Sequence, residues 1–151
     1  MNINFLRIAT FKNYFIGIFL LFLLAYTSAC KKEANHQTIP NVVVDIYVDV
    51  TSTIYMELSI VSGHTFLTGG YKGIVVYRLS ESEFVAYDRA CSYDPTNSCR
   101  LVFEQNQLNL VDTCCGSKFI IIDGSVQNGP ATMSLKQYKT TFDGTNLHIF
   151  N

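Results

Sequence analysis

The sequence predicts an all-β fold, a small antiparallel sandwich or barrel, for residues 41–151. Three observations support this prediction. The chain has 11 Phe and 9 Tyr but only 3 Pro, and Val and Ile are frequent; such a composition favours strands. No stretch after Cys30 sustains the apolar spacing of a helix. Turn-forming residues recur at the short intervals that are typical of a sandwich or barrel.

The first predicted strand covers 42–50, where β-branched residues partly alternate and place Asp45 and Asp49 on one face. These acids lack the Asp-x-Asp-x-Asp spacing of a calcium loop, so we expect solvated strand charges. The next segment, 51–63, stays open between two interpretations. Its apolar residues alternate as in a strand, yet an irregular segment that buries only a few of them would show the same pattern.

From residue 65 onwards the alternation of strand and turn is regular. Breaks at Gly69-Gly70 and 80–82 separate the first strands, and 105–107, Gly124 and Asp143-Gly144 separate the later ones. The strands predicted from these breaks are 65–68, 73–79, 83–88, 100–104, 108–111, 118–123, 135–142 and 146–150.

Residues 1–29 are predicted to be a signal peptide. Arg7 and Lys12 precede an apolar run over 14–26, which is shorter than the roughly 20 residues that cross a bilayer. Small residues follow, directly before Cys30. This ending resembles a bacterial lipobox, in which the cysteine is acylated and becomes the new N-terminus, although a threonine stands where such boxes usually have Leu.

Residues 30–40 are predicted to be a lipidated cysteine followed by a polar, flexible tether. Lys31-Lys32-Glu33 resembles the start of many Bacteroidetes lipoproteins. This implies a cell-envelope protein, lipid-anchored to the outer or inner membrane, with a periplasmic or surface-exposed domain. Two alternatives stay open: an uncleaved anchor that begins at Ile8, and a soluble leader that ends near Cys30 without acylation.

The net charge of −1 argues against nucleic acid as a partner, because no basic field is present to bind phosphates. Removal of Arg7 and Lys12 with the signal peptide would make the chain more acidic. Gly69-Gly70 lacks the strand, loop and helix context of a nucleotide site.

Four cysteines follow Cys30: Cys91, Cys99, Cys114 and Cys115. An even number in an exported chain predicts disulfide bonds, and four cysteines allow three pairings. A bond between the adjacent Cys114 and Cys115 would be strained, which favours two bonds that join the two cysteine-containing loops.

Five motifs keep the order and spacing of a known family. They are Cys91-Ser92-Tyr93, Asp112-Thr113-Cys114-Cys115-Gly116-Ser117-Lys118-Phe119, Asp123-Gly124-Ser125-Val126, Gly129-Pro130-Ala131 and Leu135-Lys136-Gln137-Tyr138. From about Lys72 to its end, the chain resembles the Rieske iron–sulfur domain. The resemblance implies a Cys-x-His loop and a Cys-x-x-His loop, each giving one cysteine to one iron and one histidine to the other iron of a [2Fe-2S] cluster.

Only one of the family's four ligands is present at its position. Cys91 matches the first cysteine, but Tyr93 stands for the first histidine, Asp112 for the second cysteine and Cys115 for the second histidine. Tyrosine and aspartate are poor substitutes in this role. We expect Tyr93 to fill volume that a cluster would take, and Asp112 to cap backbone amides. The histidines outside both loops, expected to be surface or strand residues, are His36, His64 and His148.

The resemblance also implies a disulfide between Cys99 and Cys114, which match the cysteines that bridge the two loops in the family. Cys91 and Cys115 would then bond across the vacated site.

These residues favour a non-enzymatic envelope module that has lost its cluster and binds an unidentified envelope protein or ligand. No Ser-His-Asp set and no paired catalytic carboxylates occur in one motif. One alternative is an electron-transfer protein with a [2Fe-2S] cluster on Cys91, Cys99, Cys114 and Cys115; another is a zinc ion on the same thiolates. A further alternative is thiol–disulfide exchange at Cys114-Cys115, which lacks the Cys-x-x-Cys helix terminus that activates such thiols.

Overall fold

The computed structural model describes residues 38–105 and 107–151. The predicted signal peptide, Cys30 and His36 lie outside the described residues. The described residues belong to one compact unit, His36–Asn151, with ten strands and one short 3-10 helix, η2 (Thr53–Ser59). All strand pairs in this part of the chain are antiparallel, which confirms the predicted all-β class. No helix within these residues is long and apolar enough to span a bilayer.

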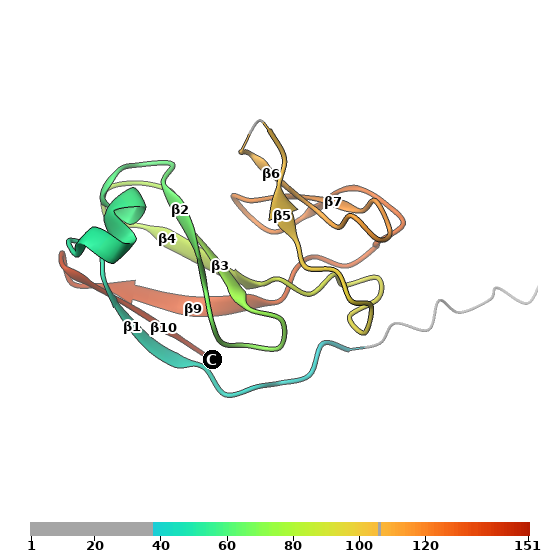
Figure 1. The fold of residues 1–151 in the computed structure, drawn as a ribbon, viewed down its shortest axis with the longest axis horizontal. Coiled ribbons are helices and arrows are strands. Elements are labelled where there is room, and N and C mark those ends of the chain that lie inside the picture. The colour runs from blue at the N-terminus through green and yellow to red at the C-terminus, as the bar shows by residue number, and fades with distance from the viewer. Residues whose placement is uncertain (1–37, 106) are drawn as a thin grey trace, which may run out of the picture. The chain divides into compact units, whose positions relative to one another are not determined.

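Six strands form one sheet in the order β1-β10-β9-β4-β3-β2 (Figure 1). Their bounds are β1 (Asp45–Asp49), β2 (His64–Leu67), β3 (Ile74–Arg78), β4 (Phe84–Asp88), β9 (Gln137–Phe142) and β10 (Asn146–Phe150). The first strand pairs with the last, with Tyr47 opposite His148. Because β4 pairs with β9, the early hairpins and the C-terminal hairpin share one sheet.

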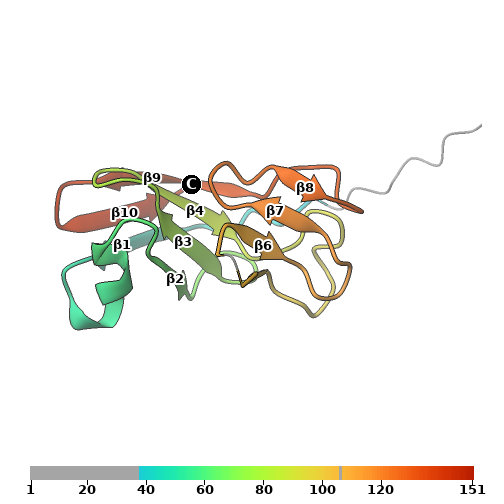
Figure 2. The same ribbon diagram turned by 90° about the horizontal axis from the view of Figure 1, so that it is seen from above.

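Four shorter strands form a second sheet in the order β5-β6-β7-β8 (Figure 2). They are β5 (Val102–Phe103), β6 (Asn109–Val111), β7 (Lys118–Ile120) and β8 (Val126–Asn128). All four strands lie between β4 and β9 in the sequence. The four-stranded sheet is therefore an insertion in the chain between two strands of the six-stranded sheet.

Strand β3 contributes to two hydrophobic clusters, since its side chains alternate between its faces. Ile74 and Val76 belong to the first cluster, and Val75 belongs to the second. The second cluster also contains Phe119 from the four-stranded sheet and Cys91. Burying a large apolar side chain contributes roughly 1.5–3 kcal/mol, so this cluster fixes the loop that carries Cys91.

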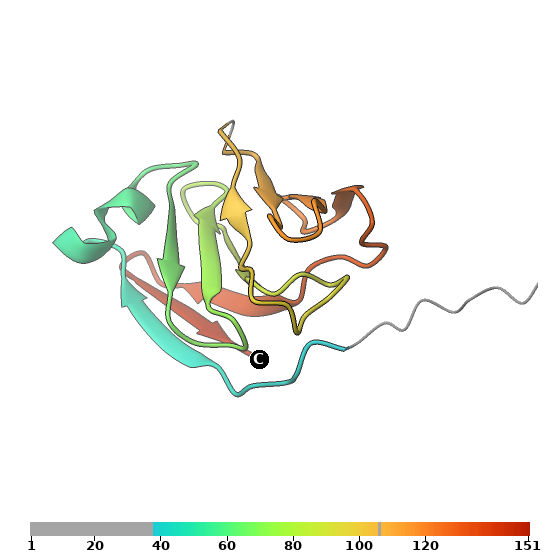
Figure 3. The same ribbon diagram turned by 45° about the vertical axis from the view of Figure 1, so that its right-hand side comes forward.

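The structure resolves the open segment 51–63 and shifts some strand ends. Thr53–Ser59 form η2 and bury only Leu58, so the apparent alternation is not that of a strand. Strand β1 begins three residues later than predicted, and β8 is a strand that the sequence pattern did not indicate. Figure 3 shows η2 at the end of the domain away from the start of the described chain.

Residues 38–44, called the strap below, precede β1 and lie against the domain. The Asn151 side chain accepts a hydrogen bond from Val44 N (3.1 Å) and donates to Val42 O (2.8 Å). Lys136 Nζ donates to Pro40 O (2.8 Å) and to Asn41 Oδ1 (3.2 Å). The last residues of the expected tether, 30–40, therefore belong to the strap, which is hydrogen-bonded to the domain.

Candidate functional site

Two loops carry the four cysteines of the domain. The first, 89–101, joins β4 to β5, and the second, 112–117, joins β6 to β7. A disulfide bond joins Cys99 to Cys114, with their Cα atoms 5.9 Å apart. This pairing is the one that the family resemblance implies.

Cys91 and Cys115 face each other as free thiols. Their Sγ atoms are 3.4 Å apart, which is a non-bonded contact rather than the about 2.05 Å of a disulfide. The structure therefore brings the expected pair together without the expected bond, and the bond stays a prediction. Cys91 is fully buried and Cys115 is partly exposed, so only Cys115 offers its sulfur to a reagent in solvent.

The environment of Cys91 keeps its thiol protonated. Burial in the second cluster, with a smaller contribution from the neighbouring Cys115, raises the pKa of Cys91 to about 12, because a thiolate there would lose its solvation. Cys91 is therefore a poor nucleophile at neutral pH. Cys115 donates to Ser117 Oγ (3.1 Å).

Asp112 caps the second loop, as predicted. Its Oδ1 accepts from the backbone amides of Cys114 (2.7 Å) and Cys115 (3.1 Å). Its Oδ2 accepts from Asn97 Nδ2 (3.2 Å), which ties the second loop to the first. The carboxylate is fully buried, and these bonds offset the cost of burying it.

Lys72 and Asn97 hold the first loop, and the sequence reasoning missed both. Lys72 Nζ donates to the backbone oxygens of Asn97 and Cys99 and to Asn97 Oδ1 (3.1 Å). Asn97 Oδ1 also accepts from Cys99 N (2.9 Å). The available signal was an Asn two residues before a cysteine, since Asn side chains often cap backbone groups two residues on.

Asp88 positions the start of the same loop from within the protein. It accepts from Ala90 N (2.9 Å) and from Tyr138 Oη (2.7 Å). It also accepts from the backbone amides of Tyr71 (2.6 Å) and Lys72 (3.2 Å). The residue directly before Cys91 is thus fixed by a buried carboxylate.

Tyr93 does not fill the site, so the expectation for it was wrong. Its side chain is 46% exposed, because the loop turns outward after Ser92. Ser92 Oγ donates to Met133 O (2.5 Å), and Ala131 N donates to Ser117 Oγ (3.0 Å). Through these bonds the segment after Pro130 closes against both loops.

The arrangement of these residues differs from the one that a [2Fe-2S] cluster requires in the family. In the family, the positions of Cys91 and Cys115 ligate different irons, so a cluster would separate their donor atoms. Here the two sulfurs are in contact. Tyr93 is exposed to solvent, and the Asp112 carboxylate already accepts hydrogen bonds from three N–H groups. This donor set does not fit the cluster.

The four cysteines also do not form a set of four free thiols in this structure. Cys99 and Cys114 are bonded to each other, and only free thiolates ligate iron or zinc. Cys91, Asp112 and Cys115 do have donor atoms within 4.8 Å of one another. This is a three-residue group without histidine.

The two described histidines lie away from these loops. His148 bonds to Asp45 Oδ1 (2.6 Å) and stacks on Tyr47, with ring centroids 4.1 Å apart. His64 packs on Phe103, with centroids 4.0 Å apart. Both are strand residues with partners, as expected.

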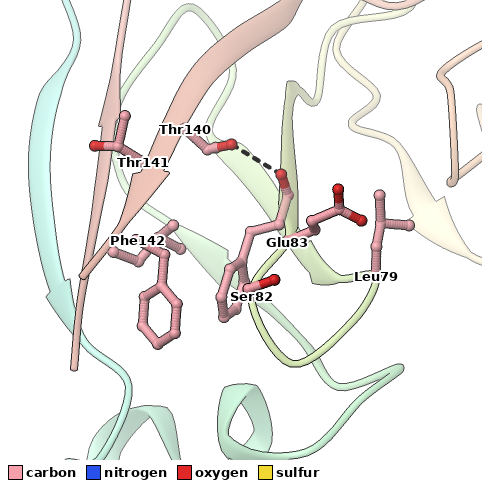
Figure 4. Close-up of a pocket in the computed structure, with 8 residues that line it drawn as sticks. Leu79, Ser82, Glu83, Thr140, Thr141 and Phe142 are labelled. Carbon is pink, nitrogen blue, oxygen red and sulfur yellow. Dashed lines mark hydrogen bonds between the residues drawn. The ribbon is translucent and has the colours of Figure 1, made fainter. Parts of the chain in front are cut away.

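A cavity of about 300 Å³ lies where the β3–β4 turn meets β9 (Figure 4). Thr140 Oγ1 donates to Phe84 O (2.8 Å) beside it, and Phe84 meets Phe142 edge to face. Its lining residues include no cysteine or histidine, so it is separate from the candidate site.

Among the comparisons with known proteins, the one with solved structures finds similar folds. No family model matches the sequence, and no curated relative matches it. Among solved structures, the plasma membrane Rieske protein PetC3 from the cyanobacterium Synechocystis PCC 6803 is 21% identical, with a TM-score of 0.53 over 69% of this chain and 99% of that one. The ferredoxin of carbazole 1,9a-dioxygenase from Nocardioides aromaticivorans IC177 is 17% identical, with a TM-score of 0.45 over 60% and 86%.

The similarity to the cyanobacterial protein covers nearly all of that structure. The described domain therefore has a Rieske-like fold, as the resemblance implied. A sequence identity of 21% shows similarity of fold alone, because proteins that share a fold often differ in function.

Proposed function

We propose that the chain is a lipid-anchored envelope protein whose Rieske-like domain has lost its cluster and serves as a non-enzymatic binding or structural module. The main support is the 3.4 Å contact between the sulfurs of Cys91 and Cys115. These positions bind different irons in the family, so their contact occupies the space that a cluster would need.

In the exported protein, Cys91 and Cys115 form a second disulfide. The exposed Cys115 thiol attacks an external disulfide, for example that of a protein thiol oxidant, and releases one thiol. Cys91 is a poor nucleophile toward external reagents, but its sulfur lies 3.4 Å from that of Cys115; it loses its proton, attacks Cys115 in the mixed disulfide and releases the second thiol. Two electrons and two protons pass from the cysteine pair to the external disulfide, and the covalent bond takes the place of the cluster in joining the two loops.

The anchor is acylated Cys30, exposed after removal of residues 1–29. Two or more acyl chains on one residue give stable attachment to a bilayer. The domain then lies in the periplasm or at the cell surface, on the outer or inner membrane, where its partner is an envelope protein.

The test uses the full-length protein purified from membranes in detergent. Its absorption spectrum, iron, sulfide and zinc contents and free thiols are measured before and after reduction. We expect a colourless protein without stoichiometric metal, with no free thiols before reduction and four thiols after reduction and unfolding. The matched Cys91→Ser variant should expose one thiol, at Cys115, without reduction.

Equal amounts of iron and sulfide with a brown colour would overturn the proposal and support the electron-transfer alternative with a [2Fe-2S] cluster. Zinc that leaves only when the thiols are alkylated would support the zinc alternative. Two free thiols in a metal-free protein would contradict the second disulfide while leaving the cluster-free domain supported.

A further inference from the structure

Two exposed apolar patches lie at opposite ends of the described domain. The tip patch consists of Tyr93 and Met133, whose side chains are 46% and 41% exposed. Their segments are joined because Ser92 Oγ, on the residue before Tyr93, donates to Met133 O. The η2 patch consists of Ile54, Met56, Ile60 and Val61, which are all exposed.

The strap brings the start of the described chain to the tip patch. Thr38 and Ile39 line a cavity of about 380 Å³ together with Ser92, Met133 and Lys136. The hydrogen bonds of Asn151 and Lys136 hold the next residues of the strap in place. In all three ribbon views this end of the domain lies opposite to η2 (Figures 1, 2 and 3).

The length of chain between Cys30 and Thr38 limits which end can approach a membrane. The eight residue-to-residue steps from Cys30 to Thr38 span at most roughly 26–29 Å. A compact unit the size of His36–Asn151 has a diameter of about 35 Å. An anchor at Cys30 therefore cannot easily bring the η2 patch to the bilayer, because the chain would have to run back along the whole domain.

We propose that the tip patch contacts the lipid bilayer that holds the anchor, so that the loop carrying Cys91 faces the membrane. This inference rests on the acylation of Cys30 in the proposed function. A tyrosine ring suits the interface between headgroups and acyl chains, and Met133 adds apolar surface. Lys136 Nζ donates to the neutral oxygens Pro40 O and Asn41 Oδ1, so its charge can attract anionic headgroups.

One acid, Asp94, follows Tyr93 at the tip patch. Its Oδ1 accepts from Thr96 Oγ1 (2.8 Å) and from the amides of Thr96 (3.0 Å) and Asn97 (3.2 Å). These hydrogen bonds, that of the Thr96 hydroxyl first, lower its pKa and keep it ionised, and they hold the carboxylate toward its own loop.

Single tryptophans give a direct test, because the chain has no Trp. Met133→Trp and Ile54→Trp each place one fluorophore at an exposed position, at the tip and in η2. The full-length lipidated proteins are reconstituted in vesicles of phosphatidylethanolamine and phosphatidylglycerol, with and without brominated acyl chains as quenchers. We expect the Met133→Trp signal to be quenched at least about twofold more than the Ile54→Trp signal, because only the tip reaches the acyl-chain boundary.

Equal quenching of both, or stronger quenching at residue 54, would overturn the inference. The mass of the N-terminal peptide reports acylation separately. An acylated protein without tip quenching contradicts only the orientation, whereas a protein without acyl groups contradicts the anchor and, with it, the orientation. Metal and thiol contents test the cluster-free domain independently of both results.

Discussion

The carboxylate of Asp112, at a position that the resemblance assigns to a ligand cysteine, holds a loop through hydrogen bonds. It accepts three hydrogen bonds in a fully buried place, two from its own loop and one from Asn97 across the site. Its neighbour in space, Cys91, is held as a neutral thiol by the same burial. At the scale of residues, the site is therefore built to keep two loops together.

Asp112→Asn should destabilise the domain by roughly 1–3 kcal/mol, because an amide nitrogen would face a backbone N–H or the Asn97 amide and leave a buried donor unpaired. Denaturant unfolding measures the difference. Asp143→Asn is a matched control, since Asp143 Oδ1 also accepts two backbone amides, from Thr145 and Asn146, but is exposed to water. A loss at position 112 no larger than at 143 would show that the buried carboxylate is unimportant.

The reduced protein should lose stability in alkali through Cys91. Burial raises the pKa of Cys91 from about 9 to about 12, so the folded state holds its proton more tightly than the unfolded state does. This contribution is complete below pH 9 and is lost as the pH rises toward 12. Tyr87, with a pKa raised to about 12 by burial, acts in the same direction.

The Cys91→Ser variant separates the two contributions, because it keeps Tyr87. Unfolding of the reduced proteins is followed between pH 8 and about 11. We expect the unmodified chain to lose more stability over this range than the variant. Parallel pH profiles would contradict the assignment to Cys91.

At the scale of elements, the first and last strands are joined to each other and to the strap. β1 pairs with β10 along its whole length, and Asn151, directly after β10, bonds to Val42 and Val44 before β1. Residues 42–44 and Asn151 are therefore neighbours in the domain. This arrangement is what fixes Thr38 beside the tip loop.

Asn151→Ala should loosen the strap. Loss of these hydrogen bonds, which are partly exposed, should cost about 1 kcal/mol and raise the hydrogen-exchange rate of the Val44 amide. Amides in the centre of β3 open only with global unfolding, so they should speed up by no more than about fivefold, the factor that 1 kcal/mol corresponds to, and by less than the Val44 amide, which also loses its own acceptor. Gln127→Ala, an exposed change in β8, serves as the control and should leave Val44 protected.

At the scale of the whole molecule, two sheets share a core that includes Cys91, and the Cys99–Cys114 disulfide joins the two loops at its edge. The Cys99–Cys114 bond spans 15 residues, and closing a loop of this size contributes about 3 kcal/mol in the chain-entropy model. The two cysteine pairs differ in accessibility, since Cys114 is exposed and Cys91 is not.

This difference predicts an order of reduction in the protein with both bonds. Attack at the exposed Cys114 opens the Cys99–Cys114 bond first. The other bond resists, because Cys91 is inaccessible and because attack at Cys115 must release Cys91 as a buried thiolate, a poor leaving group. Stepwise reduction, alkylation and peptide mass mapping follow the order; earlier labelling of Cys91 than of Cys99 would contradict it.

The sequence by itself determined the all-β class, most strands after residue 65, and the correspondence of Cys91 and Asp112 with family positions. These features are local, because strand alternation, turn residues and motif spacing each depend on residues that are close together in the sequence. The Cys99–Cys114 pairing came from the family resemblance and not from the spacing itself, which allowed three pairings.

Only the tertiary structure decided what the site has become. The contact between Cys91 and Cys115 joins residues 24 apart, and the bonds of Lys72 to the Asn97 loop join residues 25 apart. The outward turn of Tyr93, the η2 segment and the docked strap also depend on what packs against them. Such contacts arise from burial and long-range hydrogen bonding, for which local periodicity carries no signal.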